Sequence, residues 1–481
     1  MTKPLTCITL TIAVVEPDIR IPRKELFECL VGEDKYDQLL IPAWQWYLHF
    51  LDHRIREIWG TLLFPVIPGI SRSVAEPDSL ELARVYAAIV VIARAIKMQK
   101  EVSLEKIVTR LNNGQFVKAG AEAIAIRMAF AFSGWLTMLF DPKTELAGGP
   151  LQLRKHASSR AGRGRSRGAV ISCFSRGISQ GGENMHEMLF HRMLGQFGSL
   201  FPEAPRSPFP DSMLSPGLAG SDNYLTVSYI CFNTLRNVGN LRIEWVNTLN
   251  LHLQLDVRDR VLRLFRFPSF CWLLHEGYYD LSSSEDDGQP VTSFLSQMFT
   301  DYDADHKKSL LNGDPEDQDV AFSEFCREVL LSYRLIFGID GRSRRAFHSE
   351  EMSKWKIDFT NDGHSKREHK LDPLLQLLCT ASANRPELQS VLERLDGQET
   401  DASVGYAPEH FPFLGQRLAG LQRFSMSQKP YDWKSVLWRD RRDARNWWMM
   451  WTAWAVLVIG GGTLVLQFLQ LIFQIWSTFH P

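Results

Sequence analysis

Two histidines come close to a zinc-binding pattern without completing it. His186 and His191 flank Glu187 in a run that resembles H-E-x-x-H with one residue too many. Each residue of a helix turns by about 100°, so histidines five apart point about 140° away from each other. One helix cannot present both imidazoles to a single zinc ion. The spacing therefore predicts no metal site.

Three aspartates begin like a calcium-binding loop. Asp301, Asp303 and Asp305 match the first ligand positions of an EF-hand. The sixth position is His306, where a glycine normally makes the turn, and the twelfth is Asn312, where a bidentate glutamate is needed. With two of its required elements missing, the segment is expected to be a solvated acidic loop.

No other group of residues predicts a reaction. Glu285, Asp286 and Asp287 follow three serines, which is typical of an exposed loop. No phosphate-binding G-x-x-x-x-G-K-[ST] run occurs, and no G-x-G-x-x-G run follows a strand. We identify no catalytic, cofactor-binding or metal-binding residue and expect no cofactor. An enzyme whose site is assembled from dispersed residues is the alternative.

Composition indicates a folded intracellular protein. The 481 residues are 45% hydrophobic and 23% charged, which is ordinary for a chain of two or three domains. A net charge of -1 argues against nucleic acid as a partner, because phosphates need a basic surface. Seven scattered cysteines without a C-x-x-C pair are typical of small buried hydrophobes in a reducing compartment.

The C-terminal segment is the clearest feature of the chain. Residues 446–481 contain no Asp, Glu, Lys or Arg, and residues 449–466 also lack Asn and Gln. A helix of about 20 residues spans the roughly 30 Å of hydrocarbon in a bilayer. A buried helix of a soluble core rarely runs so long without a charge. We predict a transmembrane helix over residues 447–476, with membrane-interface tryptophans at both ends: Trp447, Trp448, Trp451, Trp454 and Trp476.

Charges before this helix predict its orientation. The topology-determining basic residues are Arg439, Arg441, Arg442 and Arg445, partly offset by three aspartates, whereas only His480 follows the helix. By the positive-inside rule the N-terminal bulk lies in the cytosol, as in a tail-anchored protein. We expect an endomembrane rather than the mitochondrial outer membrane. Residues 5–15 could pass for a signal peptide, but they lack a cleavage site and fit a buried strand better.

Small and amide side chains share one stripe of the predicted anchor. The stripe contains Ala453, Gly460, Thr463, Gln467, Gln470 and Gln474. In lipid, small residues let helices approach and amides hydrogen-bond across the contact. The stripe therefore predicts packing against a partner transmembrane helix or a second copy, which would make a homo-oligomer. Alternatively, Gln470 and Gln474 lie in water at the far interface.

The soluble part is expected to be mainly α with a small antiparallel β element (α+β). Composition divides it into a helical unit at 1–141, a loose linker at 142–222, a mixed unit at 223–400 with a flexible insert at 341–370, and a juxtamembrane segment at 401–446. The basic stretch 154–182 in the linker is either a true disordered segment or an error in the gene model.

Finer patterns predict particular elements. Alternation predicts strands at 241–245, 249–255 and 261–267 after a helix at 224–235, and a helix with a hairpin could belong to a winged-helix, nucleic-acid-binding domain. Residues 119–140 are apolar but are interrupted by Glu122 and Arg127, so they predict a core helix rather than a membrane span. Helices are also expected at 320–337 and 372–395. The amphipathic run 411–424 is expected either to lie on the membrane surface or to dock on the soluble body.

Several blocks resemble a family of C-terminally membrane-anchored proteins of filamentous ascomycete fungi. They are G-W-L-T-M-L-F-D-P at 134–142, I-E-W-V at 243–246, L-F-R-F-P-S-F-C at 264–271 and, above all, L-W-R-D-R-R-D at 437–443 before the tryptophan-rich anchor. The resemblance implies a fungal origin and an anchor, and it carries no activity with it. We therefore expect a membrane-tethered interaction or adaptor module with the lipid bilayer and an unknown protein as partners.

Overall fold

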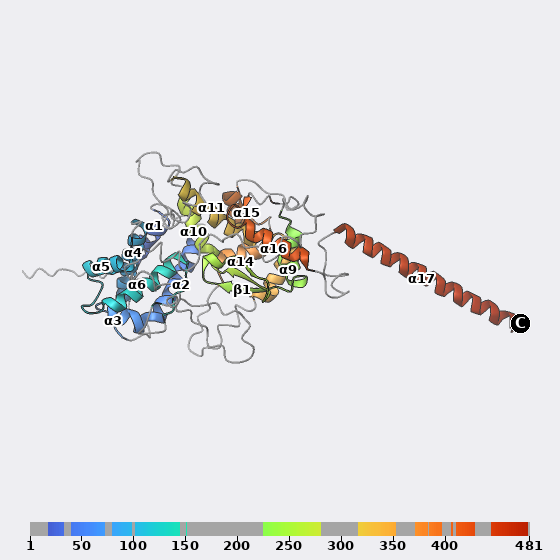
Figure 1. Cartoon of the computed structure of the whole chain (residues 1–481), viewed down its shortest axis with the longest axis horizontal. Helices are drawn as coiled ribbons and strands as arrows, with labels where there is room; N and C mark the ends of the chain where they lie inside the picture. The colour runs from blue at the N-terminus through green and yellow to red at the C-terminus, as the bar shows by residue number, and fades with distance from the viewer. Residues whose placement is uncertain are drawn as a thin grey trace, which may run out of the picture. The chain divides into compact units, whose positions relative to one another are not determined.

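The structure is a computed structural model (Figure 1). It describes residues 18–32, 40–72, 79–98, 102–144, 151, 225–279, 316–352, 371–382, 384–396, 406, 410–428 and 444–479. The expected strand at 5–15, the basic stretch 154–182, the histidines near 186, the acidic loop at 285–287 and the aspartates from 301 lie outside the described residues.

Internal contacts divide the chain into two units that are each discontinuous in sequence. Unit 1 gathers Met1–Phe201, Asn247–Asn250 and Phe267–Arg327, and unit 2 gathers Pro202–Val246, Leu251–Arg266 and Glu328–Pro481. Composition predicted consecutive segments instead. The difference arises because packing joins segments that are distant in sequence, which composition along the chain does not report.

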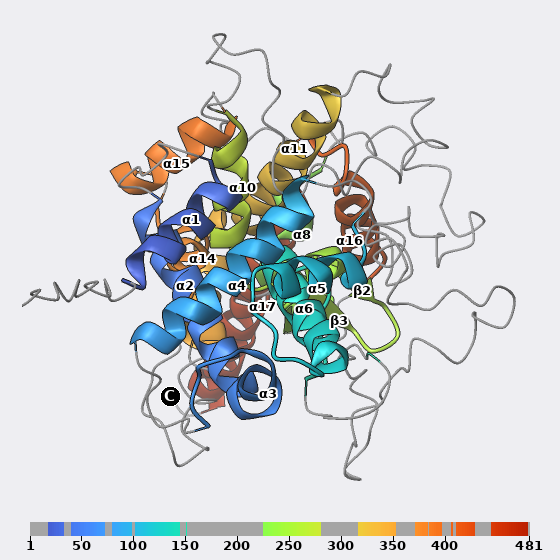
Figure 2. The same ribbon diagram turned by 90° about the vertical axis from the view of Figure 1, so that its left-hand side faces the viewer.

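Unit 1 is helical. Its helices are α1 Arg20–Leu30, α2 Ile41–Ile58, the π-helix η1 Trp59–Leu63, α3 Phe64–Val66, α4 Ser79–Met98, α5 Leu104–Asn113, α6 Glu122–Thr137 and α10 Pro268–Tyr279. α4 packs against α1, α5 and α6 (Figure 2). Pro42 stands in the first turn of α2, where no backbone N–H is needed, and Trp44 and Tyr47 on the same helix are buried. α6 is the predicted core helix and is confirmed.

A sharp turn ends α6 within the block at 134–142. Met138 adopts a left-handed conformation (φ 51°), which terminates the helix, and its carbonyl accepts a hydrogen bond from the N–H of Leu249. A Cβ on Gly134 would lie 2.8 Å from Phe140 and from Pro142. The glycine is therefore required for the chain to fold back on this helix.

Unit 2 combines a small sheet with helices. It contains α8 Val227–Ile230, α9 Phe232–Asn237, β1 Arg242–Val246, β2 Gln254–Asp256, β3 Val261–Phe265, the π-helices η7 Arg334–Gly338 and η8 Phe347–Glu351, α12 Gly341–Ala346, α14 Pro373–Thr380, α15 Pro386–Asp396, α16 Gly415–Ser427 and α17 Ala444–Phe479. Helix α11 Glu316–Tyr333 contributes residues to both units. The predicted class, mainly α with a small β element and one C-terminal apolar helix, is confirmed.

The sheet differs from the prediction in one pairing. Its strand order is β1-β3-β2, with β2 antiparallel and β1 parallel to β3. The antiparallel hairpin of β2 and β3 was predicted, but the parallel pairing of β1 was not. Residues 249–251 form a 3-10 turn, η4 Leu249–Leu251, instead of the start of a strand. This turn lets the chain reach the far side of β3, which becomes the buried central strand.

Three predicted segments are divided or ordered differently. The helix expected at 224–235 breaks at Cys231, whose backbone is extended. The helical stretch after residue 371 breaks before Pro386, because a residue that precedes proline disfavours the helical conformation. The insert at 341–370 begins with α12 and η8 rather than a loop, since Asp340 caps α12 and Phe347 packs on Phe337 with ring centres 4.9 Å apart.

Candidate functional site: the C-terminal helix and its attachment

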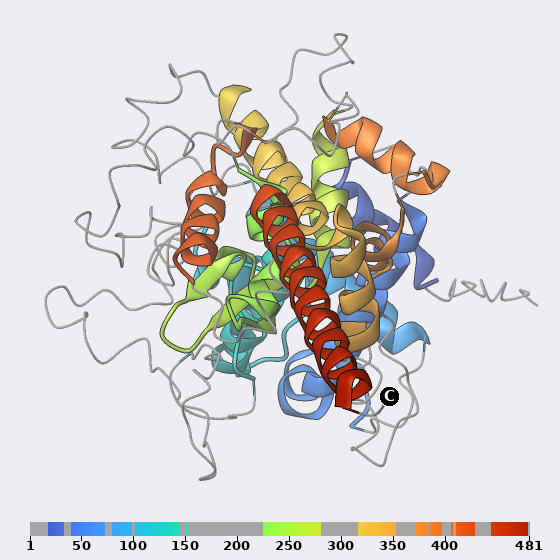
Figure 3. The same cartoon turned by 90° about the vertical axis from the view of Figure 1, so that its right-hand side faces the viewer.

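α17 is a single unbroken helix of 36 residues, about 54 Å long at 1.5 Å per residue (Figures 1 and 3). Among the described residues it is the one helix long and apolar enough to cross a membrane, over Trp451–Thr478. None of the most apolar part of this span is buried. A core helix of a soluble protein would be mostly covered, and a signal sequence would lie near the N-terminus. α17 fits neither description.

Tryptophans lie at both ends of this span with exposed rings. Trp454 and Trp476 are separated by about 33 Å along the axis, which matches the hydrocarbon thickness of a bilayer. Trp448 and Trp451 lie on the proximal side, and Trp447 and Arg445 belong to α17 without described side chains. Arg439, Arg441 and Arg442 lie outside the described residues.

All six residues of the predicted packing stripe lie in α17. They are Ala453, Gly460, Thr463, Gln467, Gln470 and Gln474, within an arc of about 100°. The Thr463 hydroxyl donates to the Gly460 carbonyl at 2.7 Å, so the helix itself satisfies it. Gln467 lies about 14 Å from Trp476 along the axis, well inside the candidate span, whereas Gln474 lies within about 3 Å of Trp476. Packing of the stripe stays a prediction.

Helix α16 is the last described element before α17. It is the amphipathic run predicted at 411–424, and the docking alternative is confirmed. Its apolar side chains Leu418, Leu421 and Phe424 are at most 1% exposed, at the spacing of one helix face. The hydrophobic face of α16 is therefore covered by unit 2.

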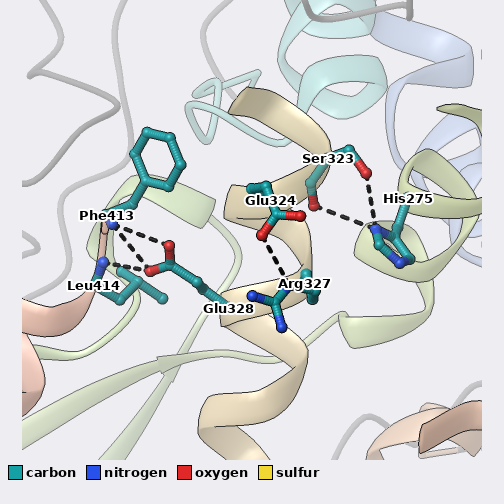
Figure 4. Close-up of polar contacts among 7 residues, drawn as sticks. All are labelled: His275, Ser323, Glu324, Arg327, Glu328, Phe413 and Leu414. Carbon is teal, nitrogen blue, oxygen red and sulfur yellow. Dashed lines mark hydrogen bonds and ion pairs between the residues drawn. The ribbon is translucent and has the colours of Figure 1, made fainter. Parts of the chain in front are cut away.

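A buried carboxylate holds the start of α16. Glu328 on α11 is fully buried, and its two oxygens accept hydrogen bonds from the backbone N–H of Phe413, at 3.0 and 3.1 Å, and from that of Leu414, at 2.6 Å (Figure 4). These N–H groups precede the first turn of α16, where the helix dipole also favours a negative charge. Leu414, at the N-cap position of α16, has no side-chain acceptor for these N–H groups, so Glu328 caps the helix in its place.

Two further side chains fix α16 along its length. The Gln422 side-chain oxygen accepts a hydrogen bond of 2.7 Å from the N–H of Thr226. The Arg417 guanidinium donates to the carbonyl of His252, and burial lowers the pKa of Arg417 to about 10. Helix α16 is therefore held by buried polar contacts as well as by its apolar face.

His252 is a neutral imidazole inside unit 2. Its Nδ1 accepts the N–H of Phe265 at 3.2 Å, so the proton is on Nε2, which lies 2.7 Å from the Ser332 hydroxyl. That hydroxyl donates to the Val329 carbonyl at 2.6 Å and can accept from Nε2. Burial, together with the charge of Arg417, lowers the pKa of His252 to about 3. The arrangement holds the ring in one tautomer. It disfavours a second proton, because Nδ1 already accepts the N–H of Phe265.

Another buried histidine belongs to unit 1. His275 Nδ1 lies 2.9 Å from the Ser323 hydroxyl (Figure 4). A hydroxyl beside an imidazole is the geometry that nucleophilic catalysis requires. His275 is 0% exposed and Ser323 2% exposed, so a substrate does not reach this hydroxyl in the structure. The pair is therefore best explained as a packing contact between α10 and α11.

The sequence analysis identified the anchor but missed its attachment. Glu328 lies three residues after Phe325 and four before Ser332, both buried, so its place on the apolar face of α11 was the available signal. Within the described part of the chain, no group of three or more His, Cys, Asp or Glu side chains is placed to hold a metal ion. No family model, no curated protein and no solved structure matches this chain.

Proposed function

We propose that the chain is a single-pass, tail-anchored membrane protein whose folded units are held at the cytosolic face of an endomembrane as an interaction module. The observation that supports this proposal is the uncovered state of α17. In the described part of the chain, every exposed large hydrophobic side chain except that of Ile21 lies in α17. A chain that buries its apolar residues elsewhere and leaves one long helix bare needs an apolar solvent for that helix.

Charge supports the cytosolic orientation. Arg439, Arg441, Arg442 and Arg445 precede the apolar span, and no Lys or Arg follows it. Basic residues stay on the cytosolic side because the anionic leaflet attracts them and translocation is costly. Residues 477–481 lie on the opposite side of the membrane in this orientation.

The attachment of α16 supports a role close to the membrane. Residues 428–443 connect α16 with α17, and a connection of 16 residues reaches at most about 58 Å when fully extended. Because α16 is docked, its C-terminal end stays within this distance of the start of α17, the helix proposed to enter the bilayer. A partner that binds unit 2 would therefore be concentrated at the membrane surface. The fungal origin and the anchored family suggested by the sequence blocks belong to the same proposal.

The first test compares the full chain with a variant truncated before Met449. Extraction with alkaline carbonate is expected to leave the full chain in the membrane pellet and to release the truncated chain. Proximity labelling is expected to give membrane-associated partners that depend on the anchor. An intact chain released by carbonate would overturn the proposal, and identical partner sets for the two forms would remove the tethering role.

The second test concerns a second copy of the chain. Gln467 is the amide of the stripe that lies well inside the hydrocarbon span, where an unpaired amide is unfavourable. Replacing Gln467 by leucine is expected to weaken self-association in detergent, because the amides would no longer bond across the contact. The matched control is Gln474→Leu, at the interface, which should change association less. Equal association of Gln467→Leu and the unmodified chain would remove the homo-oligomer.

A further inference from the structure

Arg334 is a buried charge without a carboxylate partner. Its side chain, at the start of η7, is 7% exposed, and Nη1 donates to the carbonyl of Ala381 at 3.0 Å. Two other arginines of the described chain are paired with carboxylates: Arg23 lies 2.8 Å from Asp52, and Arg54 lies 2.7 Å from Glu57. Within the described ranges, no carboxylate lies within 4.0 Å of the Arg334 guanidinium. A buried charge of this kind is unfavourable unless something compensates it.

A second arginine meets Arg334 at the end of the same π-helix. Nη1 of Arg344, on α12, donates to the carbonyls of Gly338 and Ile339. A Cβ on Gly338 would lie 2.5 Å from Cδ of Arg334 and 2.7 Å from its Nη1. Because Gly338 has no side chain, the Arg334 side chain can lie against its backbone. The carbonyl of the same glycine accepts from Arg344. Burial and the charge of Arg344 lower the pKa of Arg334 to about 10.

The nearby acidic side chains are engaged elsewhere. Asp340 accepts hydrogen bonds from the N–H and hydroxyl of Ser343, Glu350 pairs with Arg236, and Glu351 accepts the indole N–H of Trp245. Tyr406 and Cys379 are the other ionisable groups near Arg334. Burial raises the pKa of the Cys379 thiol, which keeps it neutral. The hydrogen bonds given for the Arg334 and Arg344 guanidinium groups therefore all go to backbone carbonyls.

We propose that Arg334 and Arg344 bind the phosphate group of a ligand at the surface of unit 2. Each guanidinium carries five N–H donors, and the carbonyl contacts use only part of them. Paired guanidinium groups match the several oxygens of a phosphate, which also supplies a negative charge to compensate them. Arg344 is the more exposed of the two and contacts the phosphate directly. The buried Arg334 adds a second positive charge that offsets the negative charge of the phosphate. A free phosphate compound and the headgroup of a phosphorylated lipid share this chemistry. The lipid source rests on the proposed membrane anchoring, whereas phosphate binding does not.

The test uses the full chain in detergent micelles, titrated with inorganic phosphate and with inositol trisphosphate in a calorimeter. Both probes are expected to bind. Arg344→Gln is expected to weaken binding by about tenfold or more, since a hydrogen bond to a charged group is lost. The matched control is Arg345→Gln, the neighbouring exposed arginine of α12, which removes the same charge and should leave binding within about twofold of the unmodified chain.

Further measurements decide between the outcomes. The unfolding midpoint of each variant without ligand shows that the fold is intact, and Arg334→Lys, which keeps the charge but not the planar donors, should also weaken binding. Nanodiscs with and without a phosphoinositide distinguish the sources: tighter, Arg344-dependent attachment to phosphoinositide nanodiscs supports the lipid, and equal behaviour supports a soluble phosphate. Absence of binding at millimolar phosphate, or equal loss in Arg344→Gln and Arg345→Gln, would overturn the proposal whether or not the anchor is confirmed.

Discussion

Replacing Glu328 by alanine is expected to destabilise unit 2 by about 2–5 kcal/mol, because two backbone N–H groups then lose their acceptor. Those groups belong to Phe413 and Leu414, and the carboxylate that accepts from them is fully buried. Water cannot replace it without opening the packing around α16. Urea unfolding of the full chain in detergent, followed by circular dichroism, measures the change.

The matched control lies one helical turn earlier. Glu324 is also a glutamate of α11, but its side chain is partly exposed to solvent and its partner is Arg327, at 2.8 Å (Figure 4). Glu324→Ala is expected to change the free energy of unfolding by less than about 0.5 kcal/mol, as for other surface ion pairs. Equal effects of the two substitutions would show that helix propensity, not the buried contact with α16, explains the loss.

Undocking of α16 has a second readout. The described contacts of α16 make it the point where the tether to α17 leaves unit 2. In Glu328→Ala the helix should open more often, so limited proteolysis should cut within Gly415–Ser427 faster than in Glu324→Ala. Faster cutting elsewhere in unit 2, with α16 protected, would contradict this role of Glu328.

Local features of the fold were predictable from the sequence. α17 follows from an uninterrupted apolar run, and α6 from an apolar run that Glu122 and Arg127 interrupt. Each of these helices is one continuous segment, so the residues that determine it lie close together in the sequence and the pattern can be read there. The pattern of alternating residues also located β3 and the hairpin with β2.

Pairings between distant segments were not predictable. Glu328 and Leu414 are 86 residues apart, and no periodicity connects a carboxylate on one helix with the N-terminus of another. The parallel pairing of β1 with β3 likewise depends on the turn at Leu249–Leu251, which interrupts an apolar alternation that is typical of a strand. The π-helix that brings Arg334 to Gly338 has no sequence signal of its own.

His252 connects α16 with the interior of unit 2. Its carbonyl accepts from Arg417 on α16, while its ring packs on Tyr333 with ring centres 5.1 Å apart. Protonation would place an N–H on Nδ1 against the N–H of Phe265, and it would add a second buried positive charge beside Arg417. The folded state therefore resists the proton that the unfolded chain accepts readily.

This resistance makes stability depend on pH. The pKa of His252 is about 3 in the folded state and about 6.5 in the unfolded chain, so the unfolded state binds more protons between these values. The contribution of His252 is complete above about pH 6.5 and is lost at about 1.4 kcal/mol per pH unit as pH falls toward 3. Urea unfolding at pH 7 and pH 5 should show a smaller difference in His252→Gln, which keeps an acceptor and a donor but does not titrate. His348→Gln, at an exposed histidine of the same unit, should keep the full difference. If His252→Gln retained the slope of the unmodified chain, groups other than this imidazole would control the acid sensitivity of unit 2.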